Sequence, residues 1–248
     1  MAVTRYDTVN TIVNRAAVEV GLTAIPDVFA GGDPAYAQLT GLLTSGLQTL
    51  MEDYVWNILI RTFQYTTAGG ADSVVPLPDA FAYMIPQTGW ERSENVPLLG
   101  PLSSQEWTYL LGRDLVSSTI YASFRFDQGS FYIFPNDPVP IGLDINFEYV
   151  SRNLIEIATA PATYTDVAAT AEDIVQLPAN LVVKQLKMLF LEAKGFDSTK
   201  ATDAFNLALQ SWMGKDNSAP ILNTRGGRGA YPYLNGFRNT PDTGYGGA

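Results

Sequence analysis

Apolar residues recur at helical spacing near the start of the chain. Within residues 8–20 they stand three and four positions apart, which predicts an amphipathic helix. Asp7 or Thr8 is its expected N-cap, and Gly21 its stop. A second, longer helix is predicted to open with Asp33 as the N-cap and Pro34 in the first turn, where a missing N–H costs nothing. Its apolar stripe consists of Leu39, Leu42, Leu43, Leu47, Leu50, Met51 and Tyr54.

Two glycines interrupt this second helix. Each of Gly41 and Gly46 weakens a helix by up to about 1 kcal/mol relative to alanine. We therefore expect both to mark places where another helix approaches closely.

From about residue 64 the pattern becomes one of short apolar runs separated by Gly, Pro, Asp and Asn. Residues 143–149 alternate between apolar and polar, which is the period of a strand with one buried face. Residues 126–134 predict a hairpin that turns at Asp127-Gln128-Gly129. Residues 131–153 predict a longer hairpin, because two strand-like runs flank a stretch rich in proline. One short helix, which starts after Ser103 or Ser104, is expected within this region.

Helical spacing returns at residues 177–195 and continues to 214. The strands between the two helical parts follow one another without long helices, which implies an antiparallel sandwich or small barrel. The predicted fold class is therefore α+β: a four-helix layer, made of two N-terminal and two C-terminal helices, with an inserted antiparallel β domain. The predicted domains are a discontinuous helical domain at 1–63 and 177–214, the inserted β domain at 64–176 and an extended C-terminal arm at 215–248.

The C-terminal arm has an unusual composition. Seven of its 34 residues are Gly and three are Pro, so alone it cannot bury enough apolar area to offset the entropy of ordering. It nevertheless carries several aromatic residues and a charge of +2, whereas the whole chain carries −10. A basic, aromatic arm on an acidic body is suited to lie on another surface.

Composition narrows the chemistry further. The chain has no cysteine and no histidine, which excludes disulfides, zinc sites built on these residues, and Ser–His or Cys–His nucleophiles. The net charge of −10 argues against a general nucleic-acid-binding protein. The first twenty residues carry four charges and have neither the pattern of a signal peptide nor that of a membrane anchor. We expect a soluble protein that is made in a cytoplasm and needs no cofactor.

Two other functions remain open on the residues alone. A glycosidase can work with two carboxylates and no histidine, but no spacing selects a pair among Glu91, Glu94, Glu106, Asp114 and Glu148. A carbohydrate-binding module could use the aromatic residues of the β region, although core packing is their more common role. These residues are Trp90, Trp107, Tyr109, Tyr121, Phe124, Phe126, Phe131 and Phe134.

Several short motifs in the β region, taken in order, resemble those of a known family. They are Leu77-Pro78-Asp79, Thr88-Gly89-Trp90, the stretch from Gly100 to Trp107, and residues 147–153 after the proline-rich segment. Together with residues 177–214 they resemble the head-to-tail adaptor proteins of short-tailed bacteriophages, the tail tubular protein A-like group. The similarity covers most of residues 1–214.

The resemblance implies a structural connector without catalytic activity, placed in the neck or tail of a virion after synthesis in the bacterial host cytoplasm. It implies a homo-oligomeric ring, usually of twelve copies, that joins the portal protein to the tail tube or nozzle, with tail fibres as a further partner. Double-stranded DNA would pass through this ring without sequence-specific binding, and an acidic lumen would repel its phosphates.

Two sets of residues are the expected interfaces of such a connector. In the arm, basic and aromatic side chains are expected to meet the portal or a neighbouring subunit: Arg225, Arg228, Tyr231, Tyr233, Phe237 and Arg238. At the tip of the longer hairpin, prolines fix φ and remove N–H donors, so that the tip recruits no further strand and is free to meet a neighbour. The tip residues are Pro135, Asn136, Asp137, Pro138 and Pro140. A long loop without a partner is the alternative.

Overall fold

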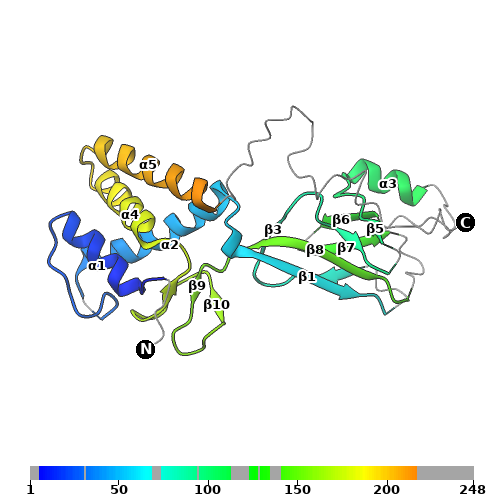
Figure 1. Cartoon of the computed structure of the whole chain (residues 1–248), viewed down its shortest axis with the longest axis horizontal. Coiled ribbons are helices and arrows are strands. Elements are labelled where there is room, and N and C mark those ends of the chain that lie inside the picture. Colours follow the sequence, from blue (N-terminus) through cyan, green and yellow to red (C-terminus); the bar gives the residue numbers. More distant parts are fainter. Residues whose placement is uncertain are drawn as a thin grey trace, which may run out of the picture.

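The computed structural model describes residues 6–30, 32–68, 74–93, 95–112, 123–127, 129–134 and 141–216. Helices gather at one end of the molecule and antiparallel strands at the other, so that two lobes follow one another along its long axis (Figure 1). The predicted mixture of helices and antiparallel sheets is therefore confirmed. The helical lobe holds α1 (Val9–Glu19), α2 (Pro34–Asp53), α4 (Ala179–Ala193) and α5 (Thr199–Asp216).

The first two helices begin where the sequence predicts. Thr8 caps α1, because its hydroxyl oxygen accepts a hydrogen bond from the backbone N–H of Thr11 at 3.3 Å. Asp33 caps α2 in the same way, accepting from Ala35 N at 2.9 Å, and Pro34 occupies the first turn. Each side chain satisfies a helix-terminal donor that would otherwise lack a partner.

Helix α4 packs against α1, α2 and α5. The close approach to α2 occurs at Gly46, as predicted: a Cβ there would lie 3.0 Å from Gln185 Oε1 and 3.2 Å from Leu189 Cδ1. Gln185 Nε2 also donates to the Gly46 carbonyl at 2.9 Å, which satisfies a polar side chain in the core. The same prediction for Gly41 is wrong, because nothing lies within 4 Å of a Cβ at that position.

A small sheet completes the helical lobe. Strand β9 (Ile155–Glu156) lies between β10 (Tyr164–Thr165) and β11 (Ile174–Val175). Leu154, Ile155, Val175 and Leu177 are fully buried in the same hydrophobic core as the helices. Part of the region between the two pairs of helices thus packs with the helices themselves.

The β lobe contains two antiparallel sheets. In the first, β8 (Asp144–Ser151) pairs with β1 (Ile60–Thr66), β3 (Phe81–Met84) and β4 (Trp90–Glu91), and β4 pairs with β5 (Val96–Pro97). In the second, β7 (Ser130–Phe134) lies between β2 (Val74–Pro76) and β6 (Ser123–Asp127). A 3₁₀ turn, η1 (Asn57–Leu59), leads into β1, and α3 (Ser104–Gly112) lies beside the second sheet.

The two sheets share an aromatic core that is separate from the core of the helical lobe. Phe131 of β7 stacks on Phe147 of β8 with ring centroids 5.4 Å apart, and Phe63 of β1 stacks on Phe147 at 4.7 Å. Such ring pairs add to the free energy gained by burying their apolar area. Each lobe therefore has its own interior.

Strand pairing corrects one of the two predicted hairpins. The turn at Asp127–Gly129 does join a hairpin, since β6 and β7 pair antiparallel. The longer hairpin predicted for residues 131–153 is wrong: among the described strands, β7 pairs with β2 and β6, and β8 with β1, β3 and β4. The two runs belong to facing sheets, since each pairs with other strands and both contribute to the same core. The prolines between them lie outside the described residues.

Candidate functional site

None of the predicted interface residues lies in the part of the chain that the structure describes. The arm residues Arg225, Arg228, Tyr231, Tyr233, Phe237 and Arg238 and the tip residues Pro135, Asn136, Asp137, Pro138 and Pro140 all lie outside it. Both interfaces therefore stay predictions.

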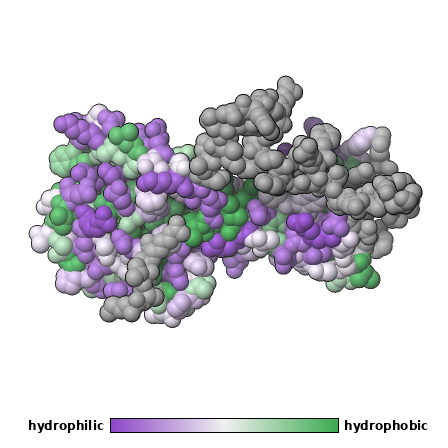
Figure 2. All heavy atoms as spheres, viewed as in Figure 1, coloured by the Kyte–Doolittle hydropathy of each residue, from purple (hydrophilic) through white to green (hydrophobic). Residues whose placement is uncertain are grey.

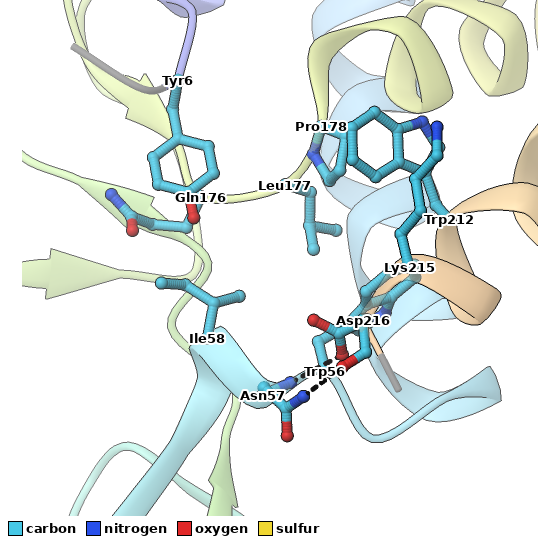
Figure 3. A pocket seen from close by; sticks show the side chains of 10 residues that line it. All are labelled: Tyr6, Trp56, Asn57, Ile58, Gln176, Leu177, Pro178, Trp212, Lys215 and Asp216. Atoms are coloured by element: carbon cyan, nitrogen blue, oxygen red, sulfur yellow. Dashed lines mark hydrogen bonds between the residues drawn. The ribbon is translucent and has the colours of Figure 1, made fainter. Parts of the chain in front are cut away.

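A pocket lies where the helical lobe meets the β lobe. This junction pocket has a volume of about 470 Å³ (Figure 3). Its walls come from four segments: the residues before α1, the turn that leads into β1, the segment between β11 and α4, and the end of α5. Its lining residues are Tyr6, Trp56, Asn57, Ile58, Gln176, Leu177, Pro178, Trp212, Lys215 and Asp216.

Hydrogen bonds hold the pocket's lower wall in place. Asn57 Nδ2 donates to the main-chain oxygen of Asp216 at 2.6 Å, and Asn57 N donates to its carboxylate Oδ2 at 2.9 Å. These contacts connect positions 159 residues apart in the chain. They fasten the end of α5 to the start of the β lobe (Figure 3).

The two tryptophans of the pocket have different roles. Trp56 is almost fully buried, and its indole Nε1 donates to the Leu50 carbonyl at 2.7 Å, so it closes the end of α2. Trp212 is half-buried, and the Lys215 ammonium lies 4.4 Å from its ring centroid, a cation–π contact.

The chemistry of the junction pocket is that of a structural joint. Polar and apolar surface share its walls about equally, and its charged groups are one lysine and one aspartate. Nearby, burial and, to a smaller extent, the Asp216 carboxylate raise the pKa of the Tyr54 phenol. A pocket lined by such residues can hold a segment of polypeptide in position or accommodate an apolar side chain.

The candidate carboxylates of a glycosidase have other partners. The Glu91 carboxylate faces the interior and accepts from Ser93 N at 2.8 Å and Asp144 N at 3.0 Å. The Glu106 carboxylate accepts from Ser103 N at 2.8 Å, and Ser103 Oγ accepts from Glu106 N at 3.3 Å. These two bonds form a capping box at the start of α3, the short helix expected after Ser103 or Ser104. These hydrogen bonds to Ser103 lower the pKa of Glu106.

Glu148 lies apart from Glu91. It is exposed on β8, on the sheet face opposite to that of Glu91, because Glu91 pairs with Ile145 and successive strand residues face opposite ways. Glu94 and Asp114 lie outside the described residues.

Most described members of the predicted aromatic platform serve the core of the β lobe. Trp107, Phe124 and Phe131 are buried, and Phe126 packs against the same core. Trp90 is different, since it pairs with Asn146 across β4 and β8. Tyr121 lies outside the described residues.

Sequence reasoning did not find the junction pocket. Its principal residues, Trp56, Asn57, Trp212 and Asp216, lie at the ends of predicted elements, where no periodic pattern singles them out. The available signal was the pair of tryptophans, which are scarce in this chain.

Within the described residues, no group of three or more acidic side chains could hold a metal ion, and no helix is long and apolar enough to cross a membrane. A scan against models of protein families and a search of curated proteins found no match for this chain.

Proposed function

We propose that the chain is a structural subunit of a short-tailed bacteriophage, a head-to-tail adaptor that forms a ring between the portal and the tail tube or nozzle. In this proposal the helical part is the four-helix layer, the β lobe is its sandwich insertion, and DNA passes through the ring.

The observation that carries the proposal is the two-lobed subunit. Two hydrophobic cores belong to a single chain, and β1 and β8 run between them, paired from Ile60 and Val150 onward. Asn57 and Asp216 add a second connection at the junction pocket. A connector must meet one partner with one end and another partner with the other end, while the two ends stay in a fixed relation.

Two glycines of the motifs behind the resemblance lie in closely packed positions of the β lobe. A Cβ at Gly89 would lie 2.9 Å from Met84 Cε. A Cβ at Gly100 would lie 2.5 Å from the Phe124 carbonyl oxygen, and the backbone there has φ of +155°. Glycine is required where a side chain would collide with backbone. Gly100, one of the residues that carry the resemblance to adaptor proteins, is therefore needed by this fold, whereas a Cβ at Gly89 would meet side-chain atoms only.

Charge is compatible with a passage for DNA. The whole chain has a net charge of −10 and the C-terminal arm has +2, so the remainder carries −12. A lumen lined by negative charge would repel the phosphates of DNA, so that the DNA could slide through it. A map of the electrostatic potential inside an assembled ring tests this part, and a strongly positive lumen would contradict it.

The decisive experiment mixes the purified protein with portal protein from the same phage and measures the mass and the class averages of the product by electron microscopy. We expect a ring of adaptor copies on the portal. A variant that lacks residues 217–248 should fold but attach more weakly. A protein that stays monomeric with the portal present would overturn the proposal.

The enzymatic alternative is tested in parallel by peptidoglycan release. Glu91→Gln, Glu106→Gln and Glu148→Gln are the matched variants. Release by the unmodified protein that any one of them abolishes would replace the structural proposal with a lytic one.

A further inference from the structure

A polar cleft lies on the outer face of the first sheet of the β lobe. Its volume is about 480 Å³, and it is formed by β1, β8, β4 and the turn before β4. The residues that line it are Thr62, Gln64, Thr88, Trp90, Arg92, Asp144, Asn146, Phe147 and Glu148. We call it the sheet cleft.

Strand register gathers these side chains. Gln64 of β1, Asn146 of β8 and Trp90 of β4 stand directly opposite one another across three neighbouring strands. Directly opposed residues place their Cβ atoms about 5 Å apart on the same face. Two amide side chains and one indole therefore form a row, with Thr62 and Glu148 as the next pair along β1 and β8.

Asn146 points to a ligand. Its residue is 93% buried, since 7% of its surface is exposed, yet it lines the cleft. Its one side-chain hydrogen bond within the described chain runs from Nδ2 to the Asp144 carbonyl at 3.5 Å, which is long for such a bond. An asparagine amide offers two donors and an acceptor with two lone pairs. Most of that capacity is free for a molecule in the cleft.

The neighbouring polar groups are also available. Among the described residues, the side chains of Gln64, Asp144 and Glu148 have no hydrogen-bond or ion-pair partner. The Arg92 guanidinium lies beside the Trp90 ring, 5.6 Å from its centroid. The cleft thus combines donors, acceptors and an apolar wall, as binding sites do.

The charge and geometry of the cleft select the class of ligand. Two carboxylates against one guanidinium disfavour an anion such as a phosphate. A metal ion is disfavoured because Asp144 and Glu148 stand four positions apart on a strand, about 13 Å along it. A polypeptide strand would add at a sheet edge, whereas this cleft is on a sheet face. With anions, metal ions and polypeptide strands disfavoured, a neutral molecule rich in hydroxyl groups is the class of ligand that fits the cleft.

We propose that the sheet cleft binds a neutral oligosaccharide. The Asn146 and Gln64 amides and the acidic side chains would bond to its hydroxyl groups, which both donate and accept. The Trp90 indole would face its C–H groups. This inference does not rest on the adaptor function, and a virion subunit that binds glycans would add a contact with the surface of the host cell.

The test is isothermal titration of the full-length protein with neutral hexasaccharides of glucose, galactose, mannose and N-acetylglucosamine. We expect at least one to bind. Gln64→Ala should weaken that binding about tenfold, the effect of losing roughly 1.4 kcal/mol. Gln64 is exposed, so the fold should be kept. Thr66→Ala is the matched control, because Thr66 is exposed on the same strand but does not line the cleft, and its affinity should stay within about twofold.

Asn146→Ala provides the second variant, with circular dichroism to verify its fold, and should weaken binding at least as much as Gln64→Ala. Two outcomes overturn the proposal: no hexasaccharide binds, or Gln64→Ala binds a hexasaccharide as well as the unmodified protein does. If no saccharide binds and Gln64→Ala also loses ring assembly, the cleft is a protein interface instead. Portal attachment by the same variants is measured separately, so that failure here and failure of the adaptor function are distinguished.

Discussion

Replacement of Asp173 by asparagine should strongly destabilise the helical lobe. The Asp173 residue is 1% exposed, and its two carboxylate oxygens accept four hydrogen bonds. Oδ1 accepts from Ala158 N at 3.1 Å and from the Thr170 hydroxyl at 2.8 Å. Oδ2 accepts from Ala169 N at 2.9 Å and from Thr170 N at 2.8 Å. The Asp173 carbonyl in turn accepts from Val9 N at 2.8 Å, which connects this loop to α1.

The size of the loss follows from these bonds. Asparagine keeps one acceptor oxygen and turns an NH₂ group toward two donors, which lose their partner. Each buried donor left without a partner costs about 1–3 kcal/mol, so Asp173→Asn should lower the free energy of unfolding by about 3 kcal/mol at pH 7. For a chain of this size that corresponds to a fall in Tm of about 6–12 °C.

The effect should depend on pH in a defined direction. Burial alone would raise the pKa of Asp173, but the hydrogen bonds from Thr170, Ala158 and Ala169 outweigh it and lower the pKa. The folded pKa is thus below the unfolded one. The stabilisation is present above the ordinary pKa of an aspartate and is lost as the pH falls through the folded pKa. The difference in unfolding free energy between the unmodified protein and Asp173→Asn should therefore become smaller as the pH falls from 7 toward about 3.

Urea denaturation followed by circular dichroism measures the free energy of unfolding at pH 7 and its change with pH. Glu172→Gln, at the exposed neighbouring residue, is the control. If Asp173→Asn unfolded within about 0.5 kcal/mol of the unmodified protein, or if the difference stayed constant at low pH, this account of the carboxylate would be refuted.

Three further predictions, which use four substitutions, test the packing and the helix ends. Gly46→Val should destabilise the fold by about 1–3 kcal/mol through overpacking against α4. Gly41→Ala lies in open space and should stabilise the fold by up to about 1 kcal/mol. Thermal denaturation measures both changes, and equal Tm shifts would contradict the contrast. Asn57→Ala should speed hydrogen exchange in the last turn of α5, since it removes the bond to the Asp216 main chain, and unchanged protection would argue against that anchor. Ser103→Ala should lower the free energy of unfolding by about 1 kcal/mol, because it removes the cap of α3. Hydrogen exchange should become faster in α3 and stay unchanged elsewhere. Unchanged exchange in α3 would show that the cap does not stabilise this helix.

The helices could be predicted because their signals are local. Thr8 and Asp33 cap helices whose apolar periodicity extends over several turns, and Gly195, with φ of +73°, follows the end of α4. The capping box of Ser103 and Glu106 is likewise contained within four residues. Such features depend on neighbours in the sequence, so one sequence is sufficient to find them.

Strand partners and the candidate sites could not be predicted in the same way. Runs 130–134 and 144–151 are adjacent strand patterns, and only the competing partners β1 and β6 determine that they do not pair. Asn146 lies on the polar side of its alternation, yet it is buried in the row between Gln64 and Trp90. Both facts depend on contacts between distant segments, which no local pattern encodes.

The pairing of Ile60 with Val150 has a consequence for the modularity of the chain. The polypeptide leaves the helical lobe and returns to it at two directly opposed residues, which in an antiparallel pair lie about 5 Å apart. That separation is short enough for a tight turn to bridge. A chain in which a few residues replace positions 61–149 would therefore retain both strand ends in place, and the helices could accept an exchanged domain without rearranging their own interior.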